Sequence, residues 1–160
     1  MRCPPGWRPD GPAADGRGAA ALSPDGTQRL VVHLAVHDAR EGGPDFAARM
    51  QAAAARVLSH LAAQPGAAAP EIVTISGASQ PILEIGSTFY DDAQTPLTLI
   101  RQWHAIAPLD ADAGQLAVVA FSLMTPALRP TAASADLATG FQTGLRAAAA
   151  AIVDAGGDAD

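Results

Sequence analysis

The segment from Gln115 to Met124 is almost continuously apolar, and it restricts the possible folds more strongly than any other part of the chain. Its length suits a β-strand, and a strand without polar alternation is typical of the middle of a sheet that is covered on both faces. The rest of the chain must therefore supply elements that cover two faces of one sheet. This requirement favours an α/β fold.

Four further segments have the periodicity of regular structure. Residues 28–38 alternate, which predicts a strand that buries the face carrying Leu30, Val32, Leu34 and Val36. Gly43-Pro44-Asp45 begins a predicted helix that ends at Gln64-Pro65-Gly66. A second strand is predicted over 71–76, and a last helix follows Ser134 or Asp136, either of which can cap it.

The secondary structure of two further segments is predicted from shorter patterns. Residues 81–85 form either a third strand or a loop. Thr95-Pro96 predicts a helix start, because Leu99, Ile100, Trp103 and Ile106 then share one helical face before Pro108.

The resulting order is strand, helix, strand, an optional strand, helix, strand and helix. It predicts an α/β layered sandwich, with a ferredoxin-like α+β sandwich as the alternative if 81–85 pairs as a strand. All of this lies in one predicted domain over 19–160. Residues 1–18 are predicted to form a flexible Pro/Gly-rich tail, because Trp7 is the one large apolar side chain between Pro4 and Gly18.

The composition excludes several classes of partner. The formal net charge is −6, and the scattered Arg residues form no basic stripe for nucleic-acid phosphates. No apolar run reaches the roughly 18 residues of a membrane span. Cys3 is the single cysteine, so neither an intramolecular disulfide nor a cysteine zinc site can form. We expect an alanine-rich cytoplasmic protein that binds no nucleic acid, membrane or cofactor.

His33 and His37 are candidate interface residues on the strand over 28–38. They share a face with Val31 and Ala35, and a face of small apolar and imidazole groups suits a subunit contact that responds to pH. Their Cα atoms would lie about 13 Å apart on a strand, which is too far for one metal ion. We therefore predict an interface, in a homo-oligomer or with another protein, and no metal site.

A second group of side chains offers the alternative of a small-molecule-binding enzyme. Its candidate catalytic residues are His104, Asp91 and Asp92, because a histidine and paired carboxylates can act as acid and base. Its candidate ligand-binding residues are Ser76, Ser79 and Tyr90, since loops after strands often hold ligands. The same acids also favour turns and helix starts, so a purely structural role stays open.

Three motifs resemble the N-terminal half of the β-ketoacyl synthase family, which has the thiolase-like fold. They are the segments Glu71–Gly77, Ala113–Val118, and Gly140-Phe141 leading into an alanine-rich helix. The family carries a nucleophilic cysteine at the start of that helix, where this chain has Ala138 or its neighbours, so the acyl-transfer step is lost. The resemblance implies a truncated, non-condensing partner of an active subunit. We therefore expect a non-catalytic binding or assembly protein.

Overall fold

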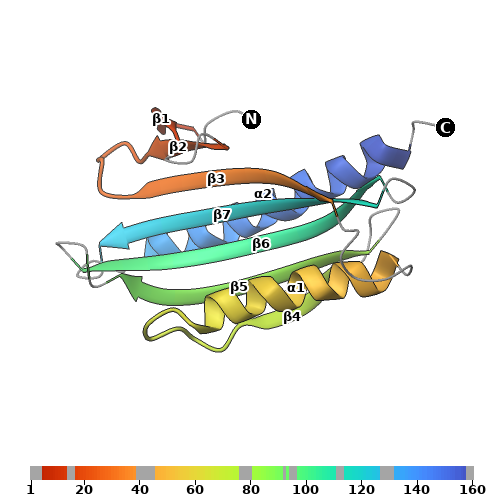
Figure 1. Cartoon of the computed structure of the whole chain (residues 1–160). Helices are drawn as coiled ribbons and strands as arrows, with labels where there is room; N and C mark the ends of the chain where they lie inside the picture. The colour runs from red at the N-terminus through yellow and green to blue at the C-terminus, as the bar shows by residue number, and fades with distance from the viewer. Residues whose placement is uncertain are drawn as a thin grey trace.

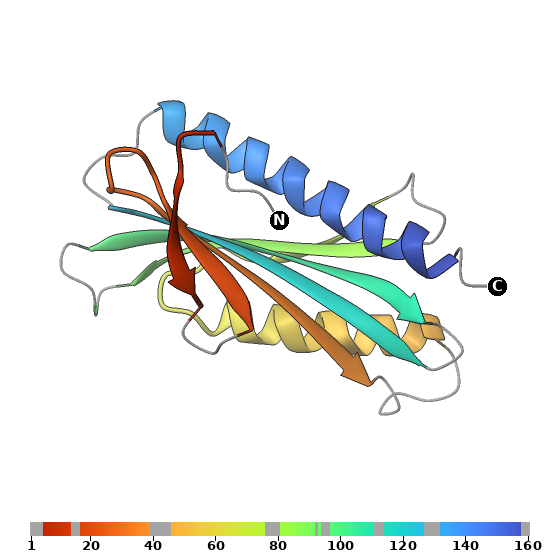
Figure 2. The same ribbon diagram turned by 90° about the horizontal axis from the view of Figure 1, so that it is seen from above.

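The protein forms a single open sheet with one helix on each face (Figure 1, Figure 2). The computed structural model describes residues 5–13, 17–38, 46–75, 81–91, 93, 97–110, 114–126 and 132–157. The strands are β1 (Arg8–Pro12), β2 (Gly18–Leu22), β3 (Arg29–Asp38), β4 (Glu71–Ile75), β5 (Ile82–Asp91), β6 (Thr98–Asp110) and β7 (Gln115–Pro126). The helices are α1 (Phe46–Ala62) and α2 (Ala132–Gly157).

The sheet has seven strands in the order β1-β2-β3-β7-β6-β5-β4, and every neighbouring pair is antiparallel. Both predicted architectures, the α/β layered sandwich and the ferredoxin-like α+β sandwich, are therefore wrong. The chain runs through three strands, one helix, four strands and one helix. The four consecutive strands β4 to β7 pair in sequence order, so no crossover helix is needed between them.

The largest local error concerns residues 95–108, for which the sequence predicts a helix. Residues 98–110 are strand β6, which pairs with β5 on one side and β7 on the other. Ile100 and Ile106 are buried toward α1, whereas Ala105 and Ala107 are buried toward α2. Because both faces of this strand are buried, its apolar residues do not alternate with polar ones, and their spacing imitates a helical face.

The N-terminal segment also differs from the predicted flexible tail. Strand β1 pairs with β2, which in turn pairs with β3. Trp7 is only 9% exposed and meets Phe141 of α2 edge to face, with ring centroids 5.4 Å apart. One distant aromatic contact therefore fixes a segment that has little apolar surface of its own.

The remaining predicted elements are present, but the last helix, α2, begins at Ala132, so Ser134 and Asp136 lie inside it and neither is its N-cap. The apolar run over 115–124 is β7, the fourth and central strand of the sheet. The helix predicted between the Gly43 and Gln64 signals is α1, and the strand over 71–76 is β4. The open question at 81–85 is answered by β5, which begins at Ile82 and extends to Asp91.

The core consists of two main clusters, one on each face of the sheet. On the α2 side, Phe121 and Leu123 of β7 pack with Phe141 and Leu145 of α2. On the α1 side, residues of α1 pack with β5 and β6, among them Met50, Leu61, Ile85, Phe89 and Ile106. The predicted buried face of β3 holds only at its start, because Leu34 and Val36 are 51% and 55% exposed.

Candidate functional site

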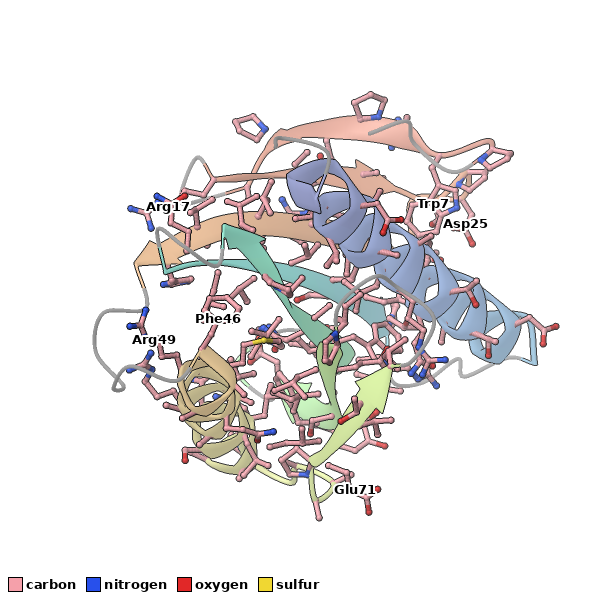
Figure 3. The ribbon with its side chains drawn as sticks, turned by 90° about the vertical axis from the view of Figure 1, so that its right-hand side faces the viewer. Trp7, Arg17, Asp25, Phe46, Arg49 and Glu71 are labelled. Carbon is pink, nitrogen blue, oxygen red and sulfur yellow. The ribbon has the colours of Figure 1, made fainter. Side chains whose placement is uncertain are left out.

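Neither of the two described helices covers one half of the α1 side of the sheet. Helix α1 packs chiefly on β5, β6 and β4. Figure 1 shows α1 in front of β4 and β5, whereas no described helix lies in front of β3 and β7. We call the α1-side positions of β2, β3 and β7 the open face; they include Leu22, Arg29, Val31, His33, Ser122 and Met124. Figure 3 shows the same arrangement from the side, with Phe46 and Arg49 of α1 on one side of the sheet and Trp7 on the other.

Two histidines with an alanine between them lie at the border between the open face and the part of the sheet that α1 covers. Ala120 of β7 is paired with His33 of β3 on one side and with His104 of β6 on the other. The three residues therefore point to the same face, and the two histidine Cα atoms lie about 10 Å apart across two strand spacings.

The environment of His104 disfavours its charged form. Burial is the main reason, and the nearby His60 of α1 and His33 of β3 add repulsion, so that the pKa of His104 falls to about 4. The Nε2 atom of His104 is buried, and no hydrogen-bond partner for it is present among the described residues. His104 is therefore neutral at pH 7 and contributes a polar but uncharged atom to this face.

A pocket lies at the end of the open face, near the turn between β2 and β3. Its volume is about 310 Å³, and the residues that line it include Leu22, Thr27, Gln28, Arg29, Thr98 and Met124. Arg29 is held by an ion pair with Asp10 of β1, with Nε and Oδ2 2.8 Å apart. The Oε1 atom of Gln28 is buried and lacks a hydrogen-bond partner in the described structure. We call this cavity the end pocket.

An ion pair between a buried carboxylate and an exposed arginine forms a second polar site, on the α2 side. Glu84 of β5 is 3% exposed and accepts hydrogen bonds from Arg146 Nε at 2.6 Å, from another Arg146 nitrogen at 3.0 Å, and from Gln142 Nε2 at 2.5 Å. The hydrogen bond to Glu84 raises the pKa of Arg146. A cavity of about 220 Å³ beside it is lined by Glu71, Val73, Gly86 and Trp103 among others. The carboxylate of Glu84 is already satisfied, so this site fastens α2 to the sheet.

The structure does not bring the candidate catalytic residues together. Asp91 is paired with Thr98, which precedes His104 on β6 by six residues, so Asp91 and His104 are about 20 Å apart along the sheet. Tyr90 is exposed and points to the face opposite that of Asp91. Asp91 accepts a hydrogen bond from the backbone N–H of Ala93, which is the turn-forming role considered for the acids. Ser76, Ser79 and Asp92 lie outside the described residues.

The two predicted interface histidines do share a face of β3. His33 is half-buried beside Ala120, whereas His37 is exposed near the end of the strand, opposite Leu116 of β7. Their positions are compatible with a contact surface along β3. The expectation of no metal ion remains untested; in the described parts of the chain, no three His, Cys, Asp or Glu side chains are grouped for a metal. Neither α1 nor the described part of α2 has the length and apolarity of a membrane-spanning helix.

Comparisons with known proteins give little guidance. No family model and no curated protein matches the chain. Among solved structures, the chain is similar to the crystal structure of LpqN, which is involved in cell envelope biogenesis of Mycobacterium tuberculosis. The sequence identity is 13% and the TM-score is 0.47, over 79% of this chain and 70% of that chain. A likeness of this size carries no argument about function. The resemblance to β-ketoacyl synthases is not tested by these findings and stays a prediction.

Sequence reasoning missed the end pocket and the role of Glu84. The pocket residues come from the ends of β2, β3, β6 and β7, and nothing in the sequence shows that these ends meet. The role of Glu84 could have been predicted, because it is the one carboxylate within the apolar run Ile82–Ile85 and a buried carboxylate needs a partner. Gln142 and Arg146 are four residues apart in an alanine-rich segment, the spacing of one helical face.

Proposed function

We propose that this protein is a binding or assembly protein that catalyses no reaction of its own and holds a protein partner on the open face. The observation that carries the proposal is the incomplete cover of the sheet. Helix α1 packs on β4 to β6, whereas the same face of β2, β3 and β7 has no described helix over it and leaves Leu22, His33 and Met124 half-buried and His37 exposed. A sheet face of this kind is a place where a partner can bury apolar surface.

The end pocket is large enough to hold one side chain of a protein partner. Small-molecule sites usually have volumes of roughly 300 to 1,000 Å³, and the 310 Å³ of the end pocket is at the lower limit. A pocket of this size suits one large apolar side chain, which would pack on Leu22 and Met124 beside the polar groups of Gln28 and Arg29. An apolar anchor within a polar rim is the usual centre of a protein interface.

The enzyme alternative has less support. A shared acid–base site needs groups within hydrogen-bond reach of one substrate, but His104 and Asp91 are about 20 Å apart and Tyr90 is on the other face. His33 and His37 instead continue the open face along β3, and we include them in the docking surface.

Methyl NMR tests this proposal with a defined probe. The chain has three methionines, of which Met124 lines the end pocket and Met50 is a buried residue of α1 itself. We expect N-acetyl-leucinamide to shift the methyl resonance of Met124 and not that of Met50. N-acetyl-glycinamide, which has no side chain, is the matched control and should shift neither. Equal shifts at both methionines, or none at Met124 up to the solubility limit of the probe, would contradict the proposed anchor pocket.

A further inference from the structure

The two edges of the sheet are built differently. The edge strand β1 contains Pro9 and Pro12, and its pairing with β2 is irregular between these two residues. Prolines and irregularities at an edge prevent another strand from adding to it. At the other edge, β4 has the sequence Glu-Ile-Val-Thr-Ile, with no proline, and it pairs with β5 in continuous register over all five residues. Proline and irregular pairing, two features that hinder the addition of another strand, therefore occur in β1 and not in β4.

Strand β4 also presents apolar side chains to solvent. Ile72 is 37% exposed and Val73 is 46% exposed. β4 is the last strand in the sheet order, so within the described part of the chain its outer side pairs with no other strand. Figure 3 shows Glu71 at this outer border of the sheet. An exposed edge of β-branched residues is a template for adding another strand.

We propose that β4 is a self-association edge, at which a second copy of this chain pairs β4 with β4 in antiparallel orientation about a two-fold axis at Val73. In this arrangement Val73 lies opposite Val73 of the second copy, Ile72 lies opposite Thr74, and Glu71 lies opposite Ile75. Each contact is made twice, as a two-fold interface requires. The two seven-stranded sheets become one continuous sheet across the interface.

The register is compatible with the charges of the strand. Glu71 is the one charged residue of β4, and it lies opposite an apolar residue rather than opposite its own copy. The two Glu71 residues are separated by four residues along the strand, or about 13 Å, which is beyond the Debye length of about 8 Å at physiological salt. The opposing β-branched side chains are of the kind that stabilises antiparallel pairs.

An extended peptide from a different protein is the competing occupant of this edge. It would use the same backbone groups, but it would leave the purified protein monomeric. The proposed open-face function does not depend on β4, because β4 lies at the opposite side of the sheet from β2 and β3. A failure of one proposal is therefore distinguishable from a failure of the other.

Sedimentation of the purified full chain provides the first test. We expect the weight-average mass to rise from 16.2 kDa toward twice that value as the concentration increases from about 5 µM to about 500 µM. Val73→Lys places two like charges directly opposite each other and should abolish the rise. Val36→Lys is the matched control, because Val36 is an exposed valine of β3 on the same sheet. A monomer at every concentration, or equal behaviour of the two variants, would overturn the proposal.

Cross-linking provides a second test that does not require a destabilising charge. In a Cys3→Ser background, Val73→Cys places two thiols opposite each other at the two-fold axis, within the distance of a disulfide. We expect oxidation to give a covalent dimer with Val73→Cys and none with Val36→Cys. Dimers formed equally by both variants, or by neither, would show that β4 does not pair with itself.

Discussion

Mild acid is expected to destabilise this protein through one side chain, His104. Its Nε2 atom is buried without a described hydrogen-bond partner, and His33 and His60 lie close enough to repel a positive charge. Protonation of His104 in the folded state therefore has a cost that does not exist in the unfolded chain. The folded pKa of about 4 is lower than the ordinary value of 6.5.

The size and direction of the effect follow from this difference. A histidine with a lowered pKa contributes its full stability above pH 6.5 and loses it as the pH falls toward 4. A pKa difference of about 2.5 units corresponds to about 3 kcal/mol of unfolding free energy. About 2 kcal/mol of this is lost by pH 5, where most carboxylates are still ionised.

Urea unfolding at about pH 7.5 and pH 5 measures this contribution. We expect the His104→Gln variant to lose about 2 kcal/mol less than the natural chain between the two pH values, because a glutamine side chain does not titrate. His37→Gln is the matched control, since it makes the same substitution at an exposed histidine of the same sheet. Equal losses in the natural chain and in His104→Gln would refute the argument from burial.

Two further predictions concern the contacts of α2. Trp7→Ala should lower the unfolding free energy by about 3 kcal/mol or more, because it removes the edge-to-face contact with Phe141, and Trp7→Phe should lose less; equal losses in calorimetric melts would contradict this. Arg146→Ala should cost about 3 kcal/mol because it leaves the carboxylate of Glu84 buried with only the amide of Gln142. Glu84→Leu should lower the unfolding free energy by less in the same urea titration, since the exposed Arg146 then stays solvated. A larger loss in Glu84→Leu than in Arg146→Ala would contradict the argument from an unpaired buried carboxylate.

The sequence was sufficient for elements whose pattern reflects a single environment. Helix α1 has clear start and stop signals, and the alternation of β3 predicts the strand, although its predicted buried face is buried only at its start. The helix prediction for strand β6 is wrong because this strand is buried on both faces, so the apolar residues near Trp103 have no period of two. The tail prediction for the segment around Trp7 is wrong because this segment pairs with β2 and packs on Phe141, which is more than a hundred residues away in sequence.

The candidate site could not be predicted from the sequence either, because it depends on contacts between segments that are distant in sequence. The sequence indicates His33 as an interface residue, but it assigns the neighbouring His104 to a helix. The row formed by His33, Ala120 and His104 depends on the registers of two strand pairings, which the sequence does not specify by itself. The exposed Leu34 and Val36 show the same limit, because alternation predicts a buried face without showing whether another element covers it.

Site-specific photocross-linking in the native host tests the proposed docking surface most directly. A photoreactive residue at Thr27, on the exposed rim of the end pocket, should give a discrete protein adduct. The same residue at Val36, which is also solvent-accessible but lies on the other face, should give none. Met124→Arg, which fills the pocket, should remove the Thr27 adduct. An adduct from Val36 alone, equal adducts from both positions, or a Thr27 adduct that persists with Met124→Arg would contradict a partner held on the open face.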